Sequence, residues 1–176
     1  HEAELLQTPD GLDENEKLVW DSIRRRLLDF LTCDGLLALV PPVDCETDDG
    51  VAVPFCLEPG TGIVSANHVP ISPWEKEIER FSQCYQLGMK VRVLTLFPSD
   101  RQPNGASLGL PLAIARERLA GRLPWFSPLN VMASGRVADS VIGVVDGVPA
   151  KQTLAAKIGA YFFAPAAQQK GKSVCI

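Results

Sequence analysis

Residues 90–97 read Lys-Val-Arg-Val-Leu-Thr-Leu-Phe and form the clearest strand pattern in the chain. β-Prone residues alternate along it and apolar side chains fall on both faces, which is typical of an interior strand. Before it, Ser72 and Glu75 have the spacing of a capping box, so we predict a helix over residues 72–87. After it, a polar loop leads to a second predicted helix over residues 106–120.

The rest of the chain mixes strand and helix patterns. Residues 51–70 alternate β-prone residues with a turn at Pro59-Gly60, which predicts a hairpin. Further helices are predicted over 14–31 and 150–159, and further strands over 36–40, 130–137, 141–145 and 161–164. Strand pairs mixed with crossing helices indicate an α+β or α/β sandwich, and we assign the fold as α+β, with helices packed on a mixed β-sheet.

Size and charge limit the classes of function. The chain has 176 residues, 46% hydrophobic and 22% charged, as expected for one soluble globular domain. Its net charge of −4 does not favour a nucleic-acid partner, and the basic run Arg24-Arg25-Arg26 would spread around a helix as a solvated face. Membrane insertion is not expected, since no run approaches the roughly 20 apolar residues that cross a bilayer.

The cysteines indicate a reducing environment. They are five, an odd number, and no two have CxxC spacing: Cys33, Cys45, Cys56, Cys84 and Cys175. This pattern does not favour a zinc site or a disulfide framework, and it is typical of a cytoplasmic protein. We therefore expect no metal and no cofactor.

A serine stands at a turn between two glycines where the helix over 106–120 begins. In the sequence Asn-Gly-Ala-Ser-Leu-Gly at 104–109, Gly105 and Gly109 allow close backbone approach on either side of Ser107. The first-turn N–H groups of a helix lack intrahelical partners and suit a developing oxyanion. Ser107 is therefore a candidate nucleophile, and its alternative role is that of an ordinary helix cap.

A lysine stands at a second glycine turn, where another predicted helix begins. Lys151 follows Asp146-Gly147 and falls in the first helical turn, where the helix dipole disfavours a cation. Its apolar neighbours would further disfavour the charged form. A lysine that acts as a general base must be neutral, so both features suit that role. The alternative is an ordinary surface lysine.

Three segments together resemble the proteolytic domain of Lon-type proteases. Residues 104–109 resemble the family's Asp-Gly-Pro-Ser-Ala-Gly motif, although Asn104 replaces the acid and Leu108 a smaller residue. Gly-Val-Pro-Ala-Lys at 147–151 resembles the Gly-Val-Thr-Ala-Lys run of archaeal-type members. Met-Ala-Ser-Gly at 132–135 corresponds to the family's Met-Thr-Gly. The resemblance extends from about residue 51 to residue 165.

This resemblance implies a Ser-Lys dyad endopeptidase. Ser107 would be the nucleophile, Lys151 the general base, and Ser134 the residue that orients the lysine by a hydrogen bond. The oxyanion would lie against the backbone at Gly105, Ala106, Leu108 and Gly109. The substrate would be an unfolded or exposed polypeptide segment.

The resemblance also bears on partners. The family's ATPase carries a phosphate loop, but Gly171-Lys172-Ser173 lacks the upstream glycine of that motif. We therefore expect ATP-independent cleavage, or an ATPase on a separate chain or domain. Since Lon proteases assemble in rings, a homo-oligomer is also expected.

Two other functions compete with proteolysis. The first is a catalytically inactive Lon-like domain that serves as an oligomerisation or protein-interaction module. The second is a cysteine hydrolase, with His68 as base and Cys56 or Cys84 as nucleophile; a mid-helix cysteine such as Cys84 is more typical of a buried apolar residue.

The chain is accordingly divided into four parts. We predict a tail over 1–12, an N-terminal helix and strand over 13–45, a Lon-like proteolytic domain over 46–170 and a tail over 171–176. The amphipathic helix over 14–31 would either pack on the domain or dock on another subunit or domain.

Overall fold

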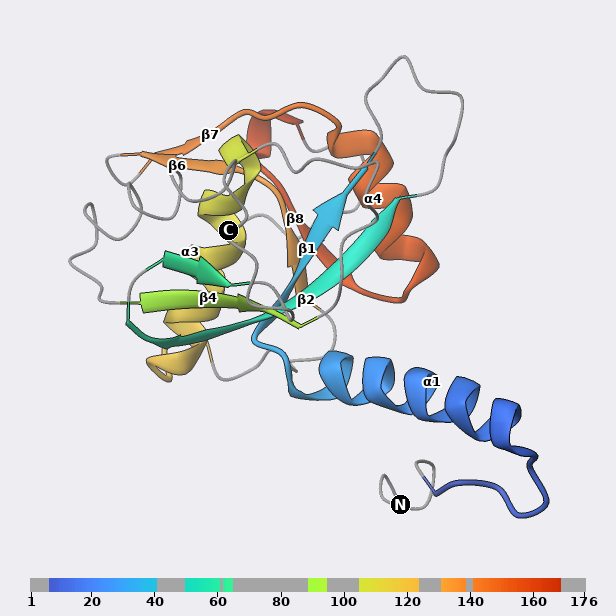
Figure 1. Cartoon of the computed structure of the whole chain (residues 1–176). Helices are drawn as coiled ribbons and strands as arrows, with labels where there is room; N and C mark the ends of the chain where they lie inside the picture. Colours follow the sequence, from blue (N-terminus) through green and yellow to red (C-terminus); the bar gives the residue numbers. More distant parts are fainter. Residues whose placement is uncertain are drawn as a thin grey trace.

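The computed structural model describes residues 7–40, 50–60, 62–64, 89–94, 105–123, 131–138 and 141–168 (Figure 1). The predicted helix over 72–87 and the predicted C-terminal tail lie outside these residues. Within them, strands and helices build a mixed α+β fold. The helices are α1 (Glu14–Thr32), α3 (Gly109–Leu119) and α4 (Val148–Lys157), with short 3-10 helices η2 (Gly105–Leu108) and η4 (Ala166–Gln168).

The main sheet has six strands in the order β3-β4-β2-β1-β5-β8. These strands are β1 (Gly35–Leu39), β2 (Val51–Pro59), β3 (Gly62–Val64), β4 (Met89–Val93), β5 (Val131–Ala133) and β8 (Tyr161–Phe163). Strand β2 is antiparallel to both β1 and β4, whereas β1·β5, β5·β8 and β3·β4 are parallel. The sheet is therefore mixed, as the sequence predicts. The strand of the N-terminal part, β1, lies inside this sheet between β2 and β5.

Strand β4 is interior, as predicted from residues 90–97. It lies between β2 and β3, and its Val91 and Val93 are buried opposite Leu57 and Phe55 of β2. Residues 95–97 of the predicted strand lie outside the described part.

The hairpin predicted over residues 51–70 is wrong. Strands β2 and β3 follow each other closely in the chain, but β4 lies between them and pairs with both. Pro59 ends β2 opposite Met89, and Gly60, at φ +134°, turns the chain so that Gly62 reaches the far side of β4 beside Lys90. Alternating residues indicated two strands, but the intervening strand comes from about 30 residues further along the chain.

Helices α3 and α4 cover opposite faces of the sheet. Leu37 of β1 is in one buried cluster with Leu112 of α3, whereas the adjacent Leu36 is in another with Leu154 of α4. Because successive strand residues point to opposite faces, the sheet is a layer between the two helices. The same alternation continues in β5, where Met132 packs on the α4 side.

A small hairpin leads from the sheet to α4. Strands β6 (Arg136–Ala138) and β7 (Val141–Gly143) pair antiparallel in a second, two-stranded sheet. The single strand predicted over 130–137 is therefore wrong, because it divides at Ser134-Gly135 into β5 and β6, which belong to different sheets. The division occurs where the Gly135 carbonyl accepts from the Leu110 N–H of α3 (2.9 Å).

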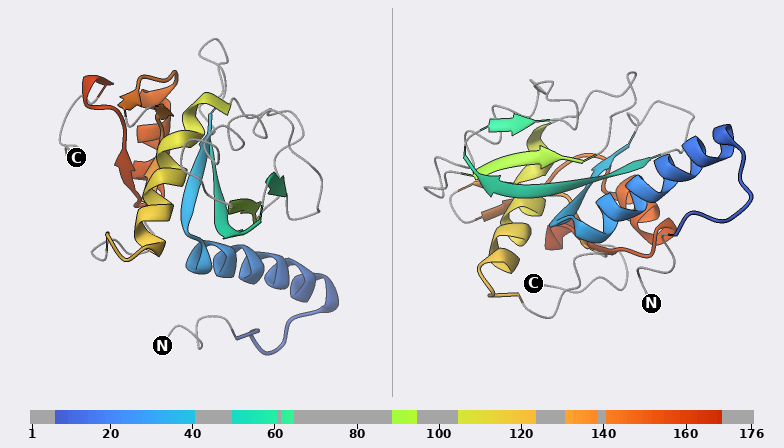
Figure 2. Two further views of the ribbon diagram at one scale, coloured as in Figure 1. Left: turned by 90° about the vertical axis from the view of Figure 1, so that its left-hand side faces the viewer. Right: turned by 60° about the horizontal axis from the view of Figure 1, so that its bottom comes forward.

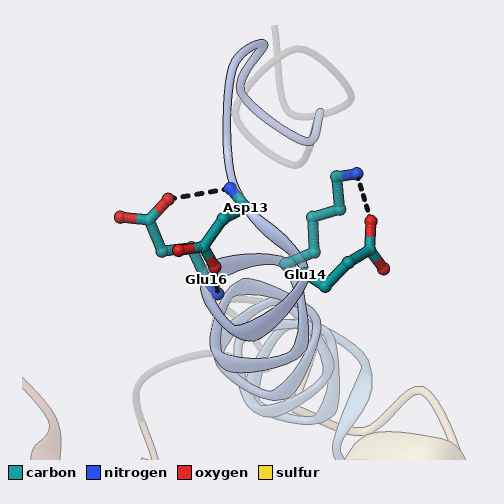
Figure 3. Close-up of polar contacts among 4 residues, drawn as sticks. Asp13, Glu14 and Glu16 are labelled. Carbon is teal, nitrogen blue, oxygen red and sulfur yellow. Dashed lines mark hydrogen bonds and ion pairs between the residues drawn. The ribbon is translucent and has the colours of Figure 1, made fainter.

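Helix α1 precedes β1 and extends from the start of that strand away from α3 and α4 (Figures 1 and 2). It begins with a capping box in which Asp13 and Glu16 bond each other's backbone N–H, and Lys17 pairs with Glu14 (Figure 3). None of its residues is buried, and its apolar residues Leu18, Val19, Ile23, Leu27 and Leu28 are exposed. At its C-terminal end the helix contacts the domain through Phe30, which is partly buried against the cluster that contains Leu36.

Candidate active site

Lys151 is placed by a glycine turn at the start of α4. Gly147 caps the helix in the left-handed conformation (φ 72°), and Pro149 stands in the first turn. A Cβ on Gly147 would lie 3.1 Å from Val40 Cγ2 and 3.7 Å from Lys151 Cε, so glycine provides both the turn and the space. The Lys151 N–H then donates to the Gly147 carbonyl (3.1 Å), which directs this side chain inward.

The Lys151 side chain is buried and hydrogen-bonded. Only 6% of its surface is exposed, and its Nζ donates to Ser134 Oγ at 2.9 Å and to the Asp146 carbonyl at 3.1 Å. Ser134 is 1% exposed. The structure thus contains the hydrogen bond between Ser134 and Lys151 that the resemblance implied.

Burial lowers the pKa of Lys151 to about 8, against the opposing charge of Asp146, which raises it. At pH 7 about one molecule in ten would then carry a neutral amine here, compared with about one in 2,500 for an ordinary lysine. A proton acceptor of this kind is available near neutral pH. Lys151 is therefore not the surface lysine that the alternative reading required.

Ser107 lies in η2, immediately before α3. The predicted helix over 106–120 thus begins as a 3-10 turn, and Ser107 is half-buried within it. The following glycine makes a close contact, because a Cβ on Gly109 would lie 2.5 Å from the backbone nitrogen of Val137. Leu108 is buried in the core between η2 and the sheet, which fixes this turn against the domain.

Backbone hydrogen bonds join the Ser107 turn to the segment that contacts Lys151. The Gly135 N–H donates to the Ser107 carbonyl (3.2 Å), and the Leu110 N–H donates to the Gly135 carbonyl (2.9 Å). Ser134 and Gly135 are adjacent residues between β5 and β6. Ser134 contacts Lys151, and Gly135 contacts the turn that carries Ser107. Three segments far apart in the sequence therefore meet at one place.

Among the predicted oxyanion residues, Gly105 and Ala106 belong to the backbone of η2, Leu108 ends it, and Gly109 begins α3. These four residues form the turn around Ser107. The Asp146 carbonyl is a partner of Lys151 that the sequence does not predict, since any residue type carries such an acceptor. The one sign of it in the sequence is Gly147, which allows the turn that points the Asp146 carbonyl toward α4.

The described residues do not support the cysteine reading. Burial raises the pKa of Cys33 to about 12 and also raises that of Cys56, so neither thiol readily forms the nucleophilic thiolate. His68 and Cys84 lie outside the described residues.

No group of His, Cys, Asp or Glu in the described ranges could hold a metal ion, and no described helix is long and apolar enough to cross a membrane.

Comparison with known proteins adds no family. No protein-family model matches this chain, and no curated protein matches it.

Proposed function

We propose that the chain is a Ser-Lys dyad endopeptidase with a Lon-type fold. The observation that carries this proposal is the buried Lys151, which combines a lowered pKa with a hydrogen bond to Ser134. Buried ionisable groups with strongly shifted pKa values occur preferentially at functional sites. Ser107 supplies the nucleophile, because its turn is bonded to the residue that follows Ser134.

The two acceptors of Lys151 suit a general base. They take two hydrogens, which is all that a neutral amine carries, and the nitrogen lone pair remains for the proton of the nucleophile. The same two acceptors would also bind an ammonium group, so the neutral form becomes accessible through burial, which lowers the pKa of Lys151 to about 8.

In the proposed reaction, Ser107 Oγ attacks the carbonyl carbon of a peptide bond as its proton passes to Lys151 Nζ. Backbone N–H groups from Gly105 to Gly109 stabilise the oxyanion. Lys151 then gives the proton to the leaving amine, and the C–N bond breaks to leave an ester on Ser107. Water hydrolyses that ester, with Lys151 again as base, which releases the acid and regenerates the serine.

The substrate class is an unfolded or exposed polypeptide segment, and cleavage is independent of ATP in this chain. The described cysteines, Cys33 and Cys56, are free thiols, which suits a protease of the reducing cytoplasm. If added ATP stimulated cleavage by the chain alone, the ATP-independent part of the proposal would fail.

The test is cleavage of an unfolded protein substrate by wild type, Ser107→Ala and Lys151→Met. Both variants should lose at least about a thousandfold in kcat/KM. Matched controls are Ser22→Ala on the exposed face of α1 and Lys157→Met, an exposed lysine of the same helix α4, and both should retain full activity. Wild-type kcat/KM should rise with pH through about 8, as Lys151 loses its proton.

The exposed apolar face of α1 favours a second candidate, an inactive Lon-like domain that serves for oligomerisation or protein interaction. Cleavage assays separate the two functions. If wild type and Ser107→Ala were equally inactive while the chain formed oligomers in sedimentation velocity, the interaction module would be the correct function.

A further inference from the structure

Gln168 binds the backbone of Val145 through both ends of its side-chain amide. The Val145 N–H donates to Gln168 Oε1 at 2.9 Å, and Gln168 Nε2 donates to the Val145 carbonyl at 2.7 Å. A neighbouring β-strand would satisfy the same two backbone groups in this way. The pairing of β7 with β6 ends at Gly143, and Gln168 supplies hydrogen bonds to the backbone two residues further on, at Val145.

Val145 directly precedes an acceptor of Lys151. The next residue along the chain is Asp146, whose carbonyl accepts from Lys151 Nζ at 3.1 Å. Val145 itself is buried with Val148 of α4 and Ala164, so the backbone is held by packing on one side and by Gln168 on the other. A shift of the Val145 peptide would move the Asp146 carbonyl with it.

The second acceptor of Lys151 is supported from the same C-terminal segment. The Ser134 N–H donates to the Phe163 carbonyl at the end of β8 (2.9 Å). Five residues further on, the Gln168 N–H donates to the Pro165 carbonyl (2.8 Å), which fixes η4 and directs Gln168 to Val145. Residues 163–168 thus hold both hydrogen-bond acceptors of the buried amine.

We propose that Gln168 is a positioning residue for Lys151. Gln168 fixes the backbone of Val145, and this holds in place the Asp146 carbonyl that accepts a hydrogen bond from Lys151 Nζ. Gln168 does not touch the reacting atoms. Its effect on turnover rests on the proposed function, but its effect on the lysine does not. Because a near-attack geometry is sensitive to shifts of about 1 Å, loss of this support should slow the chemical step more than substrate binding.

The variant Gln168→Met keeps the length of the side chain and removes both hydrogen bonds. It should lower kcat about tenfold and leave KM nearly unchanged. Gln168→Glu, which accepts from the Val145 N–H but cannot donate to its carbonyl when ionised, should give an intermediate loss and serves as a second variant if the first folds poorly. Gln7→Met, at an exposed glutamine, is the matched control and should change nothing.

A substrate-free measurement separates this proposal from the proposed function. NMR titration of the side-chain carbon next to Lys151 Nζ follows the lysine in the intact chain, with Lys151→Met to assign the resonance. Asp146 is the charged group that acts on Lys151 among the described residues, and burial has the larger effect. Loosening the turn admits water, so the pKa of Lys151 should rise toward the ordinary lysine value in Gln168→Met.

The outcomes are distinct. If the wild type cleaves no peptide but the lysine titration moves upward in Gln168→Met, the positioning role holds and the proposed function fails. Faster hydrogen exchange of the Val145 N–H would show that the variant has broken the contact. With the contact broken, an unchanged titration and an unchanged kcat would overturn the positioning role.

Discussion

Replacing Lys151 with Met should make the stability of the fold less dependent on pH. The lysine is 6% exposed, and burial brings its pKa from 10.5 down to about 8. In the unfolded chain the same side chain titrates near its ordinary value of about 10.4. A folded state that binds its proton less tightly than the unfolded state is destabilised wherever the unfolded state is protonated.

The sign and size follow from these two values. Below about pH 8 both states bind the proton, and the penalty is constant at about 3 kcal/mol, from about 1.4 kcal/mol for each pH unit. Between about pH 8 and 10.5 only the unfolded chain holds the proton, so the free energy of unfolding rises with pH. Above that range the penalty is gone. From pH 7 to about pH 9.5, Lys151 should therefore add about 2 kcal/mol to the free energy of unfolding.

The assay is urea unfolding of wild type, Lys151→Met and Lys157→Met at pH 7 and at about pH 9.5. Other groups titrate alike in all three proteins, so the difference between wild type and Lys151→Met isolates the buried amine. Lys157 is exposed on the same helix, and its variant should follow wild type. If Lys151→Met followed the wild-type pH dependence to within about 0.5 kcal/mol, the folded chain would not lower the pKa of Lys151 as described.

Two further predictions concern residues around the lysine. Ser134→Ala should slow turnover about tenfold with little change in thermal stability, since it removes one acceptor from the Lys151 amine, and full activity in this variant would remove Ser134 from the site. Gly147→Ala should lower the melting temperature, measured by calorimetry, more than Gly159→Ala does. Both glycines have φ near +70°, so alanine at either position adds about 1–2 kcal/mol of backbone strain. Only at position 147 would the new Cβ also lie 3.1 Å from Val40. Equal losses would show that the contact with Val40 is easily relieved.

Local patterns predicted several elements closely. The helix expected over 14–31 corresponds to α1 at Glu14–Thr32, and the strand expected over 161–164 to β8 at Tyr161–Phe163. The start of α1 is set by Asp13 and Glu16, which lie three residues apart, so its cap is visible in the sequence. Interactions between residues this close need no knowledge of the rest of the fold.

Partners from distant parts of the chain were not predictable in this way. Alternation indicated β2 and β3 but not that β4 lies between them. Residues 130–137 have a continuous strand pattern, yet the chain turns at Gly135, whose carbonyl binds the Leu110 N–H. The packing of α3 against β6 supplies this contact, and Gly135, where a Cβ would lie 3.1 Å from Leu110, is its one sign within residues 130–137.

The residues of the candidate site also differ in whether local sequence motifs predict them. Ser107, Ser134 and Lys151 are predictable as site residues, because their chemistry and the glycines near them form recognisable motifs. The Asp146 carbonyl and the Gln168 amide are not predictable, because every residue carries a backbone acceptor and Gln168 has no distinctive spacing. Both are found only when the fold shows which backbone groups surround the buried amine.

The stability penalty of Lys151 favours catalysis over a purely structural role. About 3 kcal/mol at neutral pH is a large part of the 5–15 kcal/mol by which domains are typically stable. Methionine could fill a similar volume without that penalty, and the hydrogen bonds to Ser134 and Asp146 offset only part of it, since each adds about 1 kcal/mol net. An interaction module that binds through the exposed face of α1 has no use for a buried amine at the start of α4. A general base needs such an amine, because the burial that destabilises the fold also lowers its pKa to about 8, where the neutral form becomes accessible.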